Sequence, residues 1–365
     1  MKNEKATFSQ VMFSIVLFNF GSSVVIGITG GVEQDGWFTI LLASLLVIPL
    51  FLVYGRIIRL FPQKDLFQVL ELIFGKIAGK VLTVLYIWYA VYLSALVLRN
   101  FSEFIQVSTM PETPQLPILI LMVLTTVYLV RSSMSSIGKW SLVMSAFVLA
   151  IVALTFVASI PDIRLENFMP VLNHTPAKIA RSTFEVFSFP YTETVIFLGL
   201  AGSFQKKANP YKMFLYSLII TTVTFLLVFI RNLSLLGATI MSLNYFPSFS
   251  AARIIQVGDF LARIESSIST NFQFAGIVKT ACCLLAASKG MASLFDLDHC
   301  RPIVLPMGML ALALGAIAYK NTMDMIAFLA YYPYYAFPFQ VAIPLAVWVG
   351  GEIYAKKHKH RELST

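Results

Sequence analysis

Charged residues are scarce in this chain of 365 residues: Asp, Glu, Lys and Arg together make up only 12% of it. In soluble globular domains they approach a quarter, so the shortage excludes an ordinary soluble protein. The sequence is instead 58% apolar, with a mean hydropathy of +0.79. Such a composition is typical of a protein that lies mostly within a lipid bilayer.

Cysteines and metal-binding patterns are also scarce. Two of the three cysteines, Cys282 and Cys283, are adjacent within a long apolar stretch, and Cys300 follows that stretch. An odd number in such positions argues against a disulfide framework, and no His/Cys cluster has the spacing of a metal site. We therefore expect neither a metal nor another cofactor.

The motifs of common enzymes are missing as well. The chain has no Walker phosphate loop, no dinucleotide-binding glycine fingerprint, no HExxH helix and no nucleophile elbow, so we do not expect an enzyme. In a soluble protein the net charge of +9 would suggest binding to nucleic acid. In a membrane protein, basic cytoplasmic loops and contact with anionic membrane lipid explain that charge, so we expect no nucleic acid as a partner.

About ten apolar stretches are each long enough to cross a bilayer, which takes roughly 20 residues. These stretches are Phe8–Thr29, Trp37–Ile58, Val81–Val107, Leu116–Val130, Trp140–Ile160, Phe184–Phe204, Phe214–Leu236, Phe272–Leu294, Ile303–Tyr319 and Met325–Tyr354. Most of the 27 basic residues fall at the two termini and in alternate loops, and short basic loops stay in the cytoplasm. The pattern predicts an all-α polytopic membrane protein with both termini cytoplasmic.

Two connecting segments carry an amphipathic pattern. In Pro62–Lys80 four apolar residues recur at helical spacing, namely Leu66, Val69, Leu70 and Ile73. In Pro247–Glu265 the same spacing relates Ile254, Val257, Phe260 and Leu261. Both patterns predict short helices at the membrane surface.

Two of the apolar stretches contain features that interrupt a helix. In the sixth, Pro190 lacks an amide hydrogen and clashes with the preceding turn, so the helix should kink or break there. In the first, Gly21 and its small neighbours permit unwinding. A plain proline kink and close packing through small residues explain each feature taken alone. The two interrupted stretches are the first stretch in each half of the chain. Interruptions at corresponding positions favour an inverted-repeat transporter fold with a site at the midplane.

The two halves predict a five-plus-five inverted repeat within a single transmembrane domain, 1–365, with repeats over about 8–160 and about 178–355. In such a fold, half-helix N-termini bind a carboxylate, whereas unwound carbonyls bind an ammonium group or a cation. A zwitterionic amino acid suits that arrangement. The candidate ligand-binding residues are Asn19, Gly21, Ser22, Ser23, Phe187, Ser188, Phe189, Tyr191 and Glu193.

Ionisable side chains within the predicted spans are a second group of candidates, because each is costly in a bilayer unless it is paired or hydrated. Three are basic and three are acidic: Arg99, Arg231, Lys279, Glu103, Glu185 and Glu193. Arg99 and Glu103 share a helix face and are candidates to pair, although Glu103 also suits the outer interface. The balance favours an intramembrane charge network, with the other partners left open. The segment Tyr331–Tyr335 predicts an interfacial aromatic belt or, alternatively, a gate over the ligand cavity.

Several stretches match a known family in order and spacing. They are Phe61–Leu66, Phe74–Lys80, the pair Arg99 and Glu103, Glu166–Leu172, the region of Glu193, and Phe260–Glu265. With them the chain resembles the B subunits of bacterial spore-germination nutrient receptors, in the amino acid–polyamine–organocation superfamily. The resemblance implies a leucine-transporter-type fold of ten helices, with helices 1 and 6 discontinuous, in the inner membrane of the dormant spore. It also implies a complex with a germinant receptor A subunit and a lipoprotein C subunit.

Three functions are compatible with these features. The leading hypothesis is a receptor subunit that binds a nutrient germinant, such as an amino acid or a sugar, at the midplane to trigger spore germination. The second is a proton-coupled secondary amino acid transporter in which Glu193 or Lys279 titrates. The third is a scaffold subunit, with the ligand sensed elsewhere in the complex.

Overall fold

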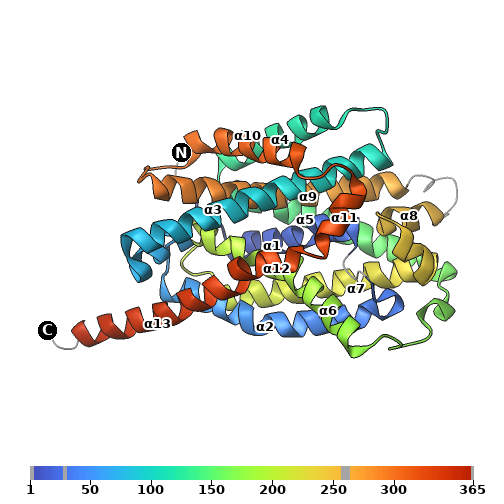
Figure 1. Ribbon diagram of the computed structural model, residues 1–365, viewed down its shortest axis with the longest axis horizontal. Coiled ribbons are helices and arrows are strands. Elements are labelled where there is room, and N and C mark those ends of the chain that lie inside the picture. Colours follow the sequence, from blue (N-terminus) through green and yellow to red (C-terminus); the bar gives the residue numbers. More distant parts are fainter. Residues whose placement is uncertain (1–3, 28–30, 256–263, 363–365) are drawn as a thin grey trace.

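The computed structural model describes residues 4–27, 31–255 and 264–362, which form helices joined by loops (Figure 1). The long helices are α1 (Phe8–Ile26), α2 (Gly36–Leu60), α3 (Leu66–Ser108), α4 (Gln115–Ser132), α5 (Met134–Ser159), α7 (Pro210–Leu243), α9 (Ile264–Leu294), α10 (Arg301–Ile317) and α13 (Ile343–Glu362). The shorter segments are η1 (Glu33–Asp35), η2 (Ile160–Asp162), η3 (Leu165–Phe168), α6 (Pro176–Ser188), η4 (Tyr191–Ser203), α8 (Pro247–Ile254), α11 (Thr322–Leu329), α12 (Tyr332–Phe337) and the π-helical η6 (Pro338–Ala342).

The long helices run side by side along the longest axis of the molecule (Figure 1). The start of the described chain and the end of α13 lie at the same end of the bundle, which we call the proximal end (left in Figure 1). Glu4 is held there by a 2.7 Å ion pair with Lys139 near the start of α5. The opposite end, which holds α8, we call the distal end. The chain therefore crosses the bundle an even number of times.

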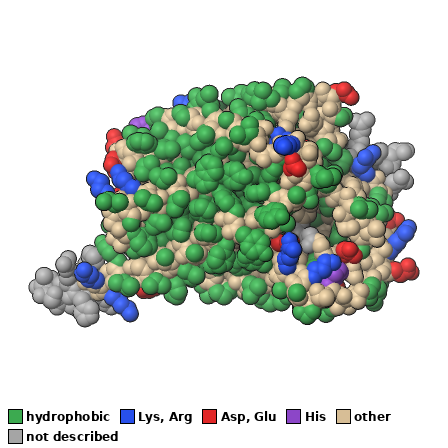
Figure 2. Space-filling model, in the orientation of Figure 1, with side chains coloured by type: hydrophobic (Ala, Val, Ile, Leu, Met, Phe, Trp, Pro, Cys, Tyr) green, Lys and Arg blue, Asp and Glu red, His purple; other side chains and the backbone are tan. Residues whose placement is uncertain are grey.

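The lateral surface is suited to lipid. Figure 2 shows hydrophobic side chains over most of one lateral face, with charged side chains gathered toward its two ends. Among the described residues, seven helices are long and apolar enough to cross a membrane, and α10 joins α11 in one more candidate span that is bent by 103°. The shorter α1 and the interrupted segment α6–η4 complete the ten crossings expected from the sequence. The protein is a multi-pass membrane protein.

The central helix of the bundle is α9, which packs against α1, α3 and α5. Small residues allow this close approach. A Cβ atom built on Gly276 would lie 2.7 Å from the ring of Phe101 on α3, and one on Gly290 would lie 2.7 Å from Ile87. As a result α9 carries Lys279 into the interior, where its side chain is fully buried.

An elbow divides α3 at Gly75, whose φ of +80° is a conformation that residues with a Cβ atom rarely adopt. The helix before the elbow buries Leu66, Val69 and Leu70 against the bundle. This confirms the amphipathic helix predicted within Pro62–Lys80.

The other predicted surface helix is described only in part. It corresponds to α8, which ends at Ile254, and the Ile254 side chain is 45% exposed rather than packed on the bundle. The rest of the expected apolar face, Val257, Phe260 and Leu261, lies outside the described residues.

Candidate functional site

The first interruption of a span lies at Gly21 in α1, where a φ of −20° and a ψ of −116° depart from helical values. A Cβ atom built on Gly21 would lie 2.7 Å from Cδ of Lys279, so a larger residue here would displace the lysine. Asn19 and Ser22 are buried at this break, and their side-chain polar atoms have no hydrogen-bond partner in the described chain. Buried polar groups in proteins normally have a hydrogen-bond partner, so these atoms are free to bond to water or to a ligand.

The second interruption separates α6 from η4. Phe189 is extended, with a φ of −126° and a ψ of 112°, and Pro190 supplies no N–H group to the next turn. The hydroxyl of Thr192 donates to the freed carbonyl of Phe187 at 3.1 Å. The chain then continues as the tightly wound η4, so this feature is a break rather than a plain proline kink. The expectation that helices 1 and 6 are discontinuous is confirmed.

A buried ion pair joins the two interruptions. Nζ of Lys279 lies 2.5 Å from Oε2 of Glu193, and both side chains are at most 1% exposed. The hydroxyl of Tyr332 donates to Oε1 of the same carboxylate at 2.5 Å. Nζ also lies 5.1 Å from the ring centre of Phe18 and 5.0 Å from that of Phe189, within the range of cation–π attraction. One carboxylate and two rings therefore surround the ammonium group, the phenol of Tyr332 holds the other oxygen of the carboxylate, and the net charge is zero.

A central cavity of about 20 Å³ opens beside this pair. Its polar lining includes Ser22, Asn100, Glu193, Lys279 and Tyr332, and Oδ1 of Asn100 also has no hydrogen-bond partner among the described residues. One water molecule needs about 10–15 Å³ of such space. The cavity in this conformation therefore admits water, and a larger guest requires the lining to move.

Gln340 connects the last span to the break in the sixth. It is buried on the π-helical η6, and its Oε1 atom accepts hydrogen bonds from the hydroxyls of Ser188 and Thr192, each at 2.8 Å. Its Nε2 atom donates to the hydroxyl of Tyr89 and to the carbonyl of Ser188, each at 3.0 Å. Sequence reasoning missed Gln340, although a glutamine within an apolar stretch was an available signal.

A cavity of about 500 Å³ approaches the centre from the distal end. Ser23 at the end of α1, Glu185 on α6 and Asn232 on α7 are among its lining residues. Phe189 lines both this distal cavity and the central cavity. The ring of Phe189 is therefore a partition between the distal cavity and the ion pair.

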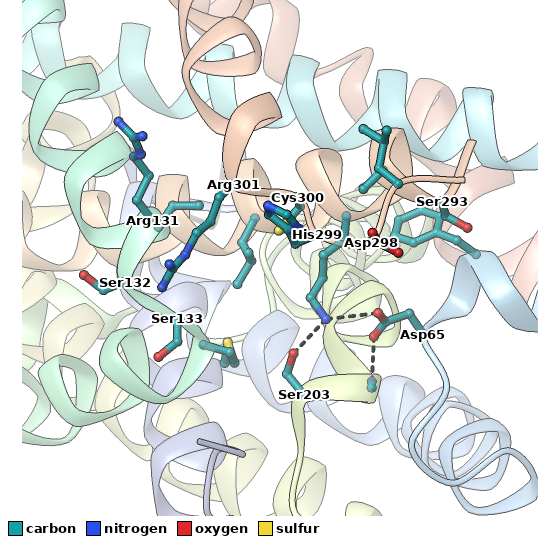
Figure 3. A pocket seen from close by; sticks show the side chains of 18 of the residues that line it. Asp65, Arg131, Ser132, Ser133, Ser203, Ser293, Asp298, His299, Cys300 and Arg301 are labelled. Carbon is teal, nitrogen blue, oxygen red and sulfur yellow. Dashed lines mark hydrogen bonds and ion pairs between the residues drawn. The ribbon is translucent and has the colours of Figure 1, made fainter. Parts of the chain in front are cut away.

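A third cavity, of about 630 Å³, lies at the proximal end (Figure 3). At its wall Asp65 accepts hydrogen bonds from Nζ of Lys289 at 3.0 Å and from the N–H of Gly202 at 2.6 Å. Lys289 also donates to the hydroxyl of Ser203 at 2.7 Å, as Figure 3 shows. This cluster ties the start of α3, the end of η4 and α9 together. It closes the proximal side of the bundle below the central pair.

The predicted ligand-binding residues do not all meet at one cavity. Ser22, Phe189 and Glu193 line the central cavity, and Gly21 abuts Lys279 beside it. Asn19 belongs to the same break in α1, and Ser23 lines the distal cavity instead.

Three of the predicted residues have other neighbours. Phe187 faces a groove between α2 and α13, Ser188 bonds to Gln340, and the hydroxyl of Tyr191 lies 2.9 Å from that of Thr222 on α7. Successive residues of an irregular segment point in different directions, so they do not share one cavity. In Tyr331–Tyr335, Tyr331 and Tyr334 are exposed whereas Tyr332 is buried at the ion pair, and the interfacial belt stays a prediction.

The expected charge network is divided into separate groups. Arg99 pairs with Glu103 at 2.7 Å, as the spacing predicted. No hydrogen bond or ion pair among the described residues connects this pair with the Glu193–Lys279 pair. Arg231 binds the hydroxyl of Thr155 at 2.8 Å and the amide oxygen of Asn232, with no carboxylate among its described partners. Glu185 pairs with Arg181 at 3.2 Å, and that arginine is 62% exposed. The internal pairing that the balance of charges favoured is therefore seen for Arg99 with Glu103 and for Lys279 with Glu193, whereas Arg231 and Glu185 have partners outside the predicted set.

Solved transporter structures share this fold. The structure of MhsT in complex with L-phenylalanine matches with a TM-score of 0.68 and 12% identity, over 96% of this chain and 89% of that chain. The structure of Mhp1, a nucleobase-cation-symport-1 family transporter, matches with a TM-score of 0.68 and 12% identity, over 97% and 91%. These likenesses confirm the expected leucine-transporter-type fold.

Relatives in sequence identify the family. Spore germination protein KB of Bacillus subtilis (strain 168) is 24% identical over 369 residues, which cover 100% of this chain and 98% of that protein. Putative spore germination protein YfkT of the same organism is 21% identical over 90% of this chain and 91% of its own length. The family described as spore germination protein, or spore permease, matches residues 5–325. The chain is therefore permease-like in fold, and it belongs to the spore germination protein family.

Proposed function

We propose that this chain is the permease-like subunit of a nutrient-germinant receptor, and that a small nutrient, an amino acid or similar, binds at the central cavity to trigger spore germination. The observation that carries the proposal is the fully buried Lys279–Glu193 pair between two interrupted helices. The unsatisfied polar atoms of Ser22 and Asn100 at the same cavity support it, because a purely structural ion pair does not require them. The family match supports the role in germination.

The charge of the site limits what can bind there. Lys279 and Glu193 neutralise each other, so a guest with a net charge would leave an uncompensated charge in the bilayer interior. A zwitterion avoids this cost, because its carboxylate can face Lys279 while its ammonium group faces Glu193. An amino acid therefore fits this site better than a simple anion or cation.

Entry would take place from the distal cavity, past the ring of Phe189. The guest would then favour an open arrangement of the bundle over the occluded one. Near-complete switching requires that the ligand bind one state about 10⁴-fold more tightly than the other. The cluster of Asp65, Gly202 and Lys289 would pass the change to the proximal surface, because it ties together three elements of the site.

The surroundings of the chain are part of the proposal. We place it in the inner membrane of the spore with both termini, and hence the proximal end, cytoplasmic, in keeping with the basic loops. A germinant receptor A subunit and a lipoprotein C subunit would be its partners. The single domain would consist of two inverted repeats, over about 8–160 and about 178–355.

The proposal is tested with Glu193→Gln in a strain whose only germinant receptor contains this chain. We expect the variant to lose the nutrient response even in spores whose membrane level of the chain, measured by immunoblotting, is matched to that of the parent strain. The matched control is Glu112→Gln, which alters an exposed carboxylate in the loop between α3 and α4 and should leave the response unchanged. A normal germinant dose–response in the Glu193→Gln strain would contradict the proposal.

A secondary transporter is the second candidate, because one cavity lies at the distal end and another at the proximal end of the same bundle. Uptake of labelled amino acids by proteoliposomes that contain only this chain separates the two functions. Gradient-driven accumulation supports a transporter, and saturable binding without uptake supports a receptor. Photo-crosslinking with a germinant analogue tests the scaffold hypothesis, which requires that the label be confined to another subunit.

A further inference from the structure

The groove between α2 and α13, which Phe187 faces, lies on the membrane-facing side of the bundle and is larger than the three cavities described above. Its volume is about 710 Å³, and its walls are almost wholly apolar, with Pro49 and Val53 on one side and Leu345 and Trp348 on the other. Leu52, at its edge, is 53% exposed. The groove is therefore open to whatever surrounds the transmembrane helices.

One end of the groove is basic. Arg56 closes it there, in a 2.6 Å ion pair with Glu352 that leaves no net charge. One turn further on, the guanidinium of Arg59 lies 5.9 Å from the ring centre of Tyr211, which also lines the groove. Arg59 is exposed and has no carboxylate partner in the described chain. The rim of the groove thus carries a positive charge that nothing described in the protein neutralises.

The length of the groove matches one leaflet of a bilayer. Along α2 it extends from Leu46 to Arg56, which corresponds to about 15 Å of helix at 1.5 Å per residue. The hydrocarbon core of a bilayer is about 30 Å thick. The groove therefore runs from the middle of the membrane to its proximal surface, where the basic rim lies.

We infer that this groove binds one acyl chain of an anionic phospholipid of the proximal leaflet, with the phosphate of the lipid beside Arg59. The apolar walls match the acyl chain in polarity and length, and the uncompensated guanidinium at the rim complements a negative headgroup. A neutral lipid satisfies only the first requirement.

The occupant of this groove would touch two segments that hold the central site. Phe187 lines the groove immediately before Ser188, and Val341 lines it immediately after Gln340. Ser188 and Gln340 are joined by a 2.8 Å hydrogen bond on the inner side. An acyl chain in the groove would therefore support the break in the sixth span from behind, whether or not the central cavity binds a nutrient.

Quenching of Trp348 by brominated lipids tests the inference. In the full-length chain, Trp37, Trp88 and Trp140 are replaced by Phe, and the protein is placed in vesicles that mix phosphatidylcholine with phosphatidylglycerol. Either lipid carries brominated acyl chains in turn. We expect brominated phosphatidylglycerol to quench Trp348 with an apparent affinity about fivefold higher than that of brominated phosphatidylcholine, the preference that one basic side chain gives at a membrane surface. Arg59→Gln should abolish this preference.

The matched control is a chain that keeps only Trp88, which is 45% exposed on α3 and outside the groove. Its quenching should be equal for the two lipids. Equal quenching of Trp348 by the two lipids, or quenching by neither, would overturn the inference. Mass spectrometry of the unsubstituted chain is a second measurement. Phosphatidylglycerol should remain bound to the unsubstituted chain after purification in detergent and should be lost from the Arg59→Gln chain. Equal retention by the two chains would also overturn the inference.

Discussion

Removing one partner of the buried ion pair should cost much more than removing both. In Lys279→Met the carboxylate of Glu193 keeps only its hydrogen bond from Tyr332, and in Glu193→Gln the ammonium group faces a neutral amide and the two aromatic rings in place of a carboxylate. Each single substitution leaves an unpaired charge in the interior, and we expect it to lower the free energy of unfolding by about 3–5 kcal/mol. The double variant leaves no charge, and its loss should be no more than about 2 kcal/mol.

The four proteins of this cycle can be compared by denaturant titration in detergent micelles, with tryptophan fluorescence as the readout. The sum of the two single losses should exceed the loss of the double variant by at least about 4 kcal/mol, which is the coupling energy. The control is the Arg56–Glu352 pair, whose side chains are 40% and 31% exposed and should couple by no more than about 1 kcal/mol. If the losses at Lys279 and Glu193 simply add, the two groups do not depend on each other and the reasoning fails.

Three further predictions concern the surroundings of the pair. Gly21→Leu should abolish the nutrient response at a normal membrane level, because its side chain would displace the lysine beside it; a normal dose–response would contradict this. Gln340→Leu removes the partner of the buried hydroxyl of Ser188 and the donor to the carbonyl of the same residue, and it should lower the free energy of unfolding by at least about 2 kcal/mol, whereas an unchanged denaturation midpoint would show that its hydrogen bonds are dispensable. Asp65→Asn should weaken the proximal cluster and increase thiol labelling of a Ser203→Cys reporter, in a background without Cys300. Equal labelling with and without Asp65 would mean that the cluster does not close that side.

The fold and the two breaks could be predicted because they depend on local chemistry. Apolar length and the placement of basic residues identify crossings, and Gly21 and Pro190 act on their own backbone. The pairing of Arg99 with Glu103 was also local, since four residues separate them on one helix.

The composition of the central site could not be predicted in the same way. Lys279 is 86 residues from Glu193 and Tyr332 is 139 residues from it, so no spacing rule relates them. Gln340 reaches Ser188 only because a π-helical turn aims it there, and no periodicity reports that turn. Phe187 and Tyr191 were included because they adjoin the break, but direction along an irregular segment is set by tertiary packing.

The π-helical turn at Pro338–Ala342 restricts how this chain can change in length. Such a turn holds one residue more than an α-helical turn, so a single deletion within it would restore a regular helix. Each residue of an α-helix advances the azimuth by about 100°. A deletion within the turn would leave Tyr332 and Trp348 close to their present orientations, because the π-helical turn and the α-helical turn that replaces it close nearly the same angle. A deletion in α13 before Trp348 would instead swing Trp348 and Glu352 by about 100° toward other neighbours. The last crossing can therefore lose one residue at this turn without rotating its two ends against each other, whereas the regular helix beyond the turn cannot.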